Sequence, residues 1–126
     1  MITHTVLGGL RVSIQVNEDL VVVALAGPLD IYSVPGFREN VDPHSRPGDQ
    51  IVIDLTEITL IDSYGLGALV RLRNQAQRDG PGHLGLVCPR RHLRRVFEIT
   101  GLRQAFVFGP DLPAVRAALV AMDGPR

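Results

Sequence analysis

The chain has 126 residues, of which 45% are hydrophobic and 21% are charged. This size and balance are typical of one globular domain, so we expect a single domain over residues 1–126 with its core at about 10–122, and neither a second domain nor wholesale disorder. The 13 basic and 13 acidic side chains give a formal net charge of +0, which disfavours direct binding of nucleic acid because such proteins carry a clear basic excess.

The sequence also disfavours a membrane or secreted location. Its most apolar run, Leu20 to Ala26, is far shorter than the roughly 20 residues that a membrane-spanning helix needs. The segment from Met1 to Thr5 lacks the features of a secretory signal, and the single cysteine, Cys88, has no partner for an internal disulfide. We therefore expect a cytoplasmic protein that does not contact a membrane.

Two strands are predicted near the N-terminus. Apolar residues alternate with polar ones over 10–16, which is typical of a strand with one buried face. A turn at Asn17–Asp19 leads to Leu20–Ala26, whose continuous apolar character predicts a strand buried on both faces and stopped by Gly27-Pro28. Asp30 then lies just past a strand end, where α/β proteins commonly place functional groups.

Helices and strands alternate along the rest of the chain. After a helix of about two turns that starts near Ser33 and Pro35, we expect a strand at Ile51–Leu55, a helix at about Tyr64–Asp79, a strand at Leu84–Cys88, a helix from Pro89 to a stop at Gly101, a strand at Ala105–Phe108 and a helix after Asp111. This order predicts an α/β fold with a mostly parallel central sheet, entered by an antiparallel N-terminal hairpin, and about four helices.

Apolar stripes indicate which helix faces are buried. Leu66, Leu69 and Val70 are expected to face the core from the helix that follows Tyr64. In the last helix, one apolar stripe is predicted, formed by Leu112, Val115, Leu119 and Met122.

No motif for a metal or a nucleotide is present in the sequence. The four histidines are scattered without the spacing of metal ligands. Gly65-Leu66-Gly67 lacks the third glycine of a dinucleotide-binding turn, and no phosphate-binding loop follows elsewhere. We therefore expect no metal, no cofactor and no catalytic residues.

Ser63 is the residue with the most distinctive position, at a predicted strand-to-helix turn. A hydrolase nucleophile there would need glycine two residues before and after it, and Gly65 fits whereas Ile61 does not. Nothing nominates a base for Ser63, so a serine hydrolase is disfavoured. A phosphate on Ser63 would lie at the positive end of a helix dipole. Alternatively, Asp62 or Ser63 only caps the helix.

Three segments together resemble a known family. Gly27-Pro28-Leu29-Asp30 follows the second predicted strand, and Asp62-Ser63-Tyr64-Gly65-Leu66-Gly67 opens a helix after the strand that begins near Ile53. The third segment, 94–102, ends a later helix. In order and spacing they resemble the motifs of STAS domains, particularly of bacterial anti-sigma factor antagonists, although Tyr64 stands where that family usually has Ser or Thr.

The resemblance implies a phosphorylation-controlled binding protein that is not an enzyme. Its partner would be an anti-sigma factor of the histidine-kinase-like ATPase type, which brings the ATP and acts as the serine kinase, and a serine phosphatase would reverse the modification. Ser63 would be the phosphoacceptor, and the partner-binding residues would be Asp30, Asp62, Ser63, Tyr64, Gly65 and Leu66. The alternative is a STAS scaffold subunit of a transporter or stress-sensing complex that is never phosphorylated.

One further feature is a basic cluster formed by Arg90, Arg91, Arg94 and Arg95. These residues fall on the polar face of a predicted amphipathic helix, where they either face solvent or attract an acidic partner. Cys88 is expected to be a small buried apolar residue without a functional role.

Overall fold

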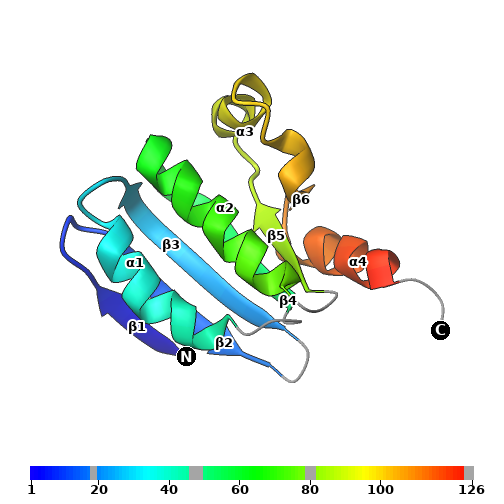
Figure 1. The fold of residues 1–126 in the computed structure, drawn as a ribbon, viewed down its shortest axis with the longest axis horizontal. Coiled ribbons are helices and arrows are strands. Elements are labelled where there is room, and N and C mark those ends of the chain that lie inside the picture. The colour runs from blue at the N-terminus through cyan, green and yellow to red at the C-terminus, as the bar shows by residue number, and fades with distance from the viewer. Residues whose placement is uncertain (18–19, 46–49, 79–81, 124–126) are drawn as a thin grey trace.

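Six strands of the described residues form one mixed sheet in chain order (Figure 1). The computed structural model describes residues 1–17, 20–45, 50–78 and 82–123. β1 pairs with β2 and β2 with β3 antiparallel, whereas the pairs from β3 to β6 are parallel. The strands are β1 (Ile2–Thr5), β2 (Arg11–Val16), β3 (Val21–Leu29), β4 (Gln50–Ile61), β5 (His83–Val87) and β6 (Val107–Gly109).

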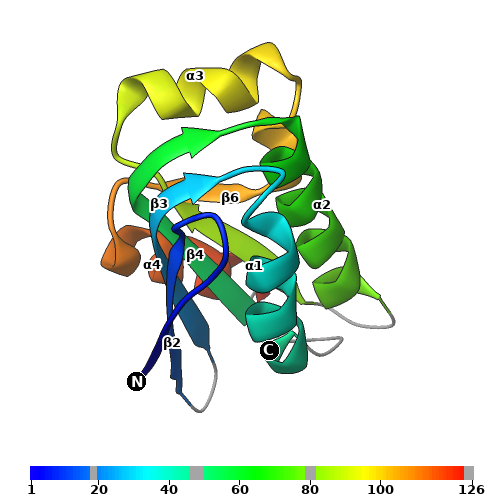
Figure 2. The same cartoon turned by 90° about the vertical axis from the view of Figure 1, so that its left-hand side faces the viewer.

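Helices lie on both sides of this sheet. They are α1 (Val34–Val41), α2 (Ser63–Gln77), α3 (Arg91–Ile99) and α4 (Leu112–Asp123), with short 3-10 helices at Asp42–His44 and Arg103–Ala105. Figure 2 shows α1 and α2 on one face, α4 on the other and α3 across one end of the sheet. The predicted fold class, an α/β fold with a parallel sheet entered by an antiparallel hairpin, is confirmed.

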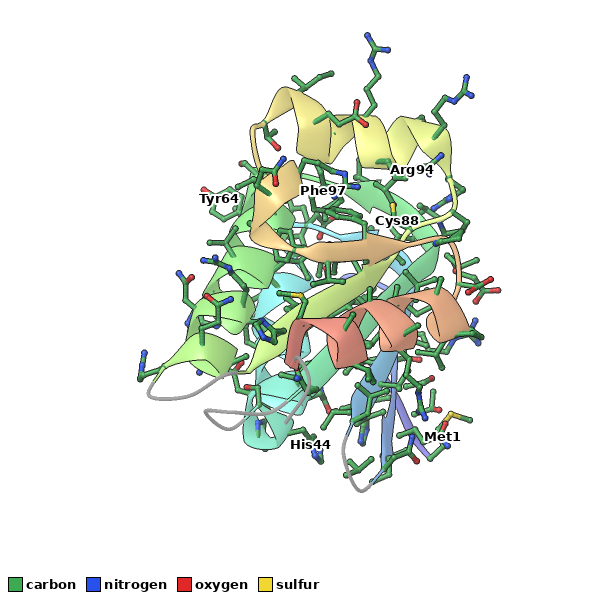
Figure 3. The ribbon with its side chains drawn as sticks, turned by 90° about the vertical axis from the view of Figure 1, so that its right-hand side faces the viewer. Met1, His44, Tyr64, Cys88, Arg94 and Phe97 are labelled. Carbon is green, nitrogen blue, oxygen red and sulfur yellow. The ribbon has the colours of Figure 1, made fainter. Side chains whose placement is uncertain are left out.

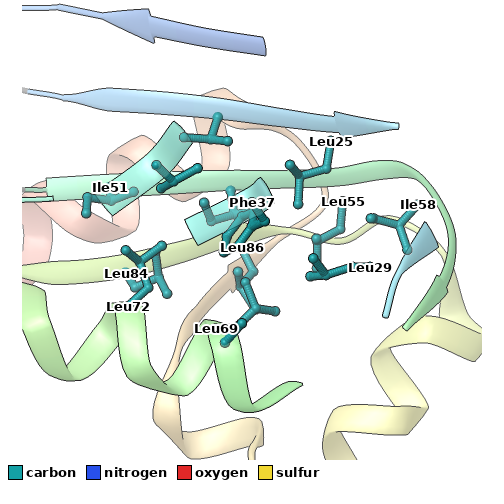
Figure 4. Packing of buried hydrophobic residues seen from close by; sticks show 14 of the residues in the cluster. Leu25, Leu29, Phe37, Ile51, Leu55, Ile58, Leu69, Leu72, Leu84 and Leu86 are labelled. Atoms are coloured by element: carbon teal, nitrogen blue, oxygen red, sulfur yellow. The ribbon is translucent and has the colours of Figure 1, made fainter. Parts of the chain in front are cut away.

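The main core fills the space between the sheet and α1, α2 and α3 (Figure 4). It includes residues from the helices on this face and from the sheet, such as Phe37 of α1, Leu69 of α2 and Ile53 of β4. A smaller cluster packs under α4 on the other face, where Val115 and Leu119 are buried. Leu112 is partly buried there and Met122 is exposed, so the predicted stripe of α4 ends before Met122 because the sheet does not reach that far.

The prediction that the second strand is buried on both faces is wrong in part. Val23 and Leu25 point into the core, but Val22, Ala24 and Ala26 are only half-buried. Their face of β3 lies beside α4 rather than beneath it, because α4 contacts β4, β5 and β6.

Two strands are longer than the sequence suggested. Gly27-Pro28 does not stop β3, because register shifts between Ala24 and Ala26 and between Gly27 and Pro28 carry the strand on to Leu29. Gly27 has φ +105, and an added Cβ would lie 2.8 Å from the Gly9 carbonyl oxygen, so only glycine fits. β4 in turn continues to Ile61, because it pairs with this extension of β3.

Other predicted boundaries shift at the ends. α2 begins at Ser63 rather than Tyr64, and β6 begins at Val107. β1 was not predicted, because its four residues are all exposed and show no apolar alternation. Asp79, two of the predicted turn residues (18–19), the last residues of the polar stretch before Gln50 (46–49) and the end of the chain (124–126) lie outside the described residues.

Cys88 lies immediately after β5 and is fully buried, as predicted. Its amide donates a hydrogen bond to the Gly109 carbonyl at 3.0 Å. Burial raises the pKa of the thiol from the ordinary 9.0 to about 11, although the positive charges of Arg94 and Arg90 act in the opposite direction. The thiol is therefore a neutral core group at neutral pH.

The raised pKa of Cys88 predicts a loss of stability in alkali. A group that binds its proton more tightly in the folded state contributes stability that is complete below the unfolded pKa and is lost as pH rises through the folded value. The free energy of unfolding should therefore fall between about pH 9 and pH 11. Urea unfolding of the wild type and Cys88→Ala across this range measures the effect, and equal pH dependence in both proteins would contradict it.

A second prediction concerns the inner face of α2. Leu69 is 0% exposed, so Leu69→Ala should lower the free energy of unfolding by about 2 to 5 kcal/mol through lost burial and a residual cavity. Val70, predicted in the same stripe, is only half-buried, and Val70→Ala should cost clearly less. Urea unfolding of both variants compares them directly, and equal costs would show that α2 faces the sheet differently.

Candidate functional site

The candidate site lies where β3 and β4 end side by side. Leu29 and Ile61 are the last paired residues of these parallel strands, so Asp30 and Asp62 follow at the same edge of the sheet. The backbone continues the contact, because the Asp62 amide donates to the Leu29 carbonyl at 3.3 Å. Two acidic residues that are 32 positions apart in the sequence thus become neighbours.

The Asp62 carboxylate holds this edge together. One oxygen, Oδ1, accepts a hydrogen bond from the Gly65 amide at 2.9 Å and caps α2. The other, Oδ2, accepts from the Ile31 amide at 3.1 Å. Asp62, rather than Ser63, is therefore the helix cap, and the same side chain ties the loop after β3 to the start of α2.

Asp30 shapes the turn that leads from β3 into α1. Its Oδ1 accepts hydrogen bonds from the amides of Tyr32 and Ser33 at 3.0 and 3.1 Å. The buried Ser33 hydroxyl accepts from the Asp30 amide at 3.0 Å and donates to the Pro28 carbonyl at 2.8 Å. Ser33 occupies the cap position of α1 as predicted, but its hydroxyl bonds to this turn and not to the helix.

Ser63 and Tyr64 form the exposed first turn of α2. The Ser63 hydroxyl has no hydrogen-bond partner among the described residues, and the Tyr64 side chain is 57% exposed (Figure 3). Their amides begin the helix and so have no intrahelical acceptor, which leaves the positive end of the helix dipole at this hydroxyl. An anion on Ser63 would meet favourable charge from the backbone.

Gly65 and Leu66, in contrast, face the interior. A Cβ on Gly65 would collide with the Leu29 carbonyl oxygen and come within 2.9 Å of Ile61 Cγ1, so glycine lets α2 approach the end of β3. Leu66 is 8% exposed and belongs to the core. These two predicted binding residues therefore position Ser63 and Tyr64, and their side chains offer little surface to another protein.

Three exposed apolar residues that were not predicted as site residues lie on the segments next to Asp30 and Asp62. Ile31, Tyr32 and Leu60 are 46%, 70% and 53% exposed. Ile31 is bonded to Asp62, Tyr32 is bonded to Asp30, and Leu60 lies two residues before Asp62 in β4. The only signal in the sequence is that these large apolar residues sit beside the acidic strand ends. Together with Ser63 and Tyr64 they form what we call the Ser63 surface.

The described residues show no arrangement typical of hydrolysis at Ser63. Its hydroxyl is bonded to no base in that part of the chain, and His4, His44, His83 and His92 come from separate elements. Within the same residues, no three side chains of His, Cys, Asp or Glu gather closely enough to hold a metal ion. The geometry is that of an exposed serine on a capped helix start, with exposed apolar residues on the same helix turn and on the neighbouring segments, which is typical of a protein-binding surface.

Comparison with known proteins places this fold and site in a family. The STAS domain family matches residues 11–115, so the chain belongs to this family and the resemblance noted from its motifs is confirmed. An anti-sigma-B factor antagonist of Bacillus subtilis is 35% identical over 94 residues, which cover 75% of this chain and 85% of that protein. The protein of the same name from Listeria monocytogenes is 35% identical over 98 residues, covering 74% and 84%.

A solved structure shares the fold at lower sequence identity. The crystal structure of an anti-sigma factor antagonist from Mycobacterium paratuberculosis matches with a TM-score of 0.74 and 20% identity, covering 89% of this chain and 95% of that one. Among the described residues of the present chain, no helix is both long and apolar enough to cross a membrane.

Alanine substitutions of Asp62 and Ser63, which are adjacent at the start of α2, should differ sharply in their effect on stability. Asp62→Ala removes two hydrogen bonds and a helix cap, and should lower the free energy of unfolding by about 1 to 3 kcal/mol. Ser63→Ala should change it by less than about 0.5 kcal/mol, because the hydroxyl is exposed and has no partner in the described chain. Thermal and urea unfolding of both variants measures this, and a larger cost for Ser63→Ala would mean that Ser63 is the cap.

Proposed function

We propose that this chain is an anti-sigma factor antagonist whose Ser63 surface binds an anti-sigma factor, so that a sigma factor is released. The partner would be of the histidine-kinase-like ATPase type and would phosphorylate Ser63, which ends the binding. The observation that carries this proposal is the exposed Ser63 hydroxyl, without a partner in the described chain, at a capped helix start among exposed apolar side chains. The antagonist relatives at 35% identity support the same role.

The residues of the site divide into two tasks under this proposal. Ser63, Tyr64, Ile31, Tyr32 and Leu60 would contact the partner, since they are exposed. Asp62, Asp30, Gly65 and Leu66 would mainly hold that surface in place. Each of the two carboxylates accepts two backbone hydrogen bonds and is only half-buried, so Asp30 and Asp62 also contribute negative charge at the edge of this surface.

Phosphorylation would act by local charge rather than by refolding. A phosphate adds about −1.5 to −2 charges, and the start of α2 tolerates an anion. An acidic group of the partner that lies near the neutral Ser63 hydroxyl would then meet a like charge, and like charges about 4 Å apart near a protein surface repel by up to roughly 4 kcal/mol. The bulk of the phosphate would also displace any group of the partner that packs against the unmodified Ser63 hydroxyl. Together these effects would lower affinity at least about a hundredfold, which corresponds to about 2.7 kcal/mol.

The remaining components of the switch would come from other proteins. ATP would be bound by the kinase partner, and a serine phosphatase would restore the free hydroxyl. The chain itself would carry no catalytic residue, no cofactor and no metal, and would act in the cytoplasm without direct contact to nucleic acid or membrane.

The test measures the affinity of four forms of the chain for one partner. The ATPase-type anti-sigma factor is first captured with Ser63→Ala as bait, identified and purified. Its affinity is then measured for the wild type, Ser63→Ala, Ser63→Asp and the enzymatically phosphorylated protein. Wild type and Ser63→Ala should bind tightly, the phosphorylated form at least about a hundredfold more weakly, and Ser63→Asp in between because it carries one charge.

The outcomes separate the competing hypotheses. Equal affinity for all four forms would contradict the switch and favour a constitutive scaffold. Phosphate mapped to Tyr64 or Thr59 would show that another residue is the acceptor. Comparing the phosphorylation of the wild type and Ser63→Ala measures the share of the phosphate that Ser63 carries. Hydrolysis of activated esters by the wild type that disappears in Ser63→Ala would instead indicate a serine hydrolase.

A further inference from the structure

The positive charge of this chain is concentrated on α3 and the segment around it. All 13 basic residues other than histidine are arginines, since the sequence contains no lysine. Residues 90–103 hold five arginines and one glutamate, whereas the rest of the sequence holds eight arginines and twelve carboxylates. The formal net charge of +0 is therefore the sum of a positive segment, residues 90–103, and a negative remainder of the chain.

The α3 arginines form no ion pair with an acidic residue in the described part of the chain. Among the described residues, the only ion pair within 4 Å joins Arg71 to Asp42, at 3.0 Å, far from α3 in the chain. Leu93 and Phe97 are buried on the inner face of α3, whereas Arg91 and Arg95 of the same helix are exposed to solvent. Arg90 is the residue just before α3, and its charge and that of Arg94 both act on the buried Cys88 thiol. Figure 3 shows Arg94 near Cys88 at the N-terminal end of the helix.

This arrangement is unfavourable for the helix itself. Arg91 and Arg95 are like charges four residues apart in α3, which repel each other on a helix. The first turn of α3 contains basic rather than acidic residues, so it also opposes the helix dipole. Local stability would favour the opposite signs. The arginines are therefore better explained by something that they bind.

α3 lies at the same end of the molecule as the Ser63 surface. Figures 2 and 3 place the C-terminal end of α3 at the level of the start of α2, where Tyr64 projects, and Figure 1 shows α3 set to one side of that helix start. A partner protein that covers Ser63 and Tyr64 and extends along this end of the molecule would reach α3. The combined surface has acidic groups, Asp30 and Asp62, at one end and the α3 arginines at the other.

We propose that Arg91 and Arg95, with Arg94 beside them, form a second docking surface that binds a carboxylate-rich region of the same protein partner that contacts Ser63. This inference rests on the proposed function and adds the chemistry of the partner to it. Guanidinium groups match carboxylates in paired hydrogen bonds, which favours arginine over lysine. Charges of opposite sign at the two ends of the surface would admit only one orientation of the partner.

A folded acidic protein fits this surface better than a bilayer or a duplex. Lipid headgroups and DNA backbones present negative charge along their whole extent, so Asp30, Asp62 and the negative remainder of the chain would be repelled. A protein can place its carboxylates opposite α3 alone. The arginines would then act mainly on the rate of association, through long-range attraction.

The test compares two variants with the same change in net charge. Arg91→Glu/Arg95→Glu reverses the α3 surface, and Arg78→Glu/Arg116→Glu reverses two exposed arginines on other elements. Association with the purified anti-sigma factor is measured by stopped flow in 50 and 500 mM NaCl. We expect the α3 variant to associate at least about tenfold more slowly at low salt, with little difference at high salt, and the control within about twofold of wild type. Equal rates for the two variants would overturn the inference.

A stability measurement separates a binding role from a structural one. Arg91→Glu alone should raise the melting temperature by about 1 to 4 °C, because it puts an acid in the first turn of α3 and four residues before Arg95. A clear fall would show that Arg91 supports the fold and would overturn the inference. The rise also ensures that slower association does not come from unfolding.

Two further measurements complete the test. Binding of the wild type to vesicles of anionic phosphatidylglycerol and to a random DNA duplex is measured at physiological salt. Absence of binding supports a protein partner. Binding that is lost in the α3 variant would overturn the inference. The effect of Ser63→Asp distinguishes the two proposals. If Ser63→Asp weakens binding and the α3 variant does not, only this inference fails; if Ser63→Asp has no effect, the proposed function fails.

Discussion

The site depends on one carboxylate that serves two segments of the chain. Asp62 caps α2 through Gly65 and holds Ile31 of the loop after β3, at 2.9 and 3.1 Å. Without this shared acceptor, two backbone amides at the edge of the sheet would lose their partner, and the start of α2 would no longer be fixed to the end of β3. The absence of a side chain at Gly65 lets the helix start lie against Leu29. Ser63 is thus presented from a rigid base although its own side chain is free.

The fold supports this edge through its strand pairing. β3 and β4 run on together past the point where β5 leaves them, since β5 pairs with β4 only as far as Asp54. This extension carries Asp30 and Asp62 away from the body of the sheet, and α3 packs across the same end (Figure 2). Phe97 of α3 makes edge-on ring contacts with Phe106 and Phe108, at centroid distances of 5.8 and 5.1 Å, which fix α3 in place.

Several features at this end lower stability and are best explained by binding. Ile31, Tyr32, Leu60 and Tyr64 expose apolar surface, and the arginines of α3 repel one another. A small protein with balanced charge therefore carries one apolar and bipolar end, which would suit the proposed partner if it is held in one orientation and released by phosphorylation of Ser63.

The sequence by itself determined most elements and the general place of the site, because apolar periodicity and turn residues act over a few positions. It placed Asp30, Asp62 and Ser63 at strand-to-helix junctions, and the parallel sheet then implied that these junctions lie together. Tertiary structure alone decided that Asp62 also binds the Ile31 amide, that Gly65 and Leu66 face inward, and that Ile31, Tyr32 and Leu60 are exposed. It also decided that β1 forms and that β3 passes through Gly27-Pro28. Each of these depends on a contact with a residue distant in the sequence, which no local pattern encodes.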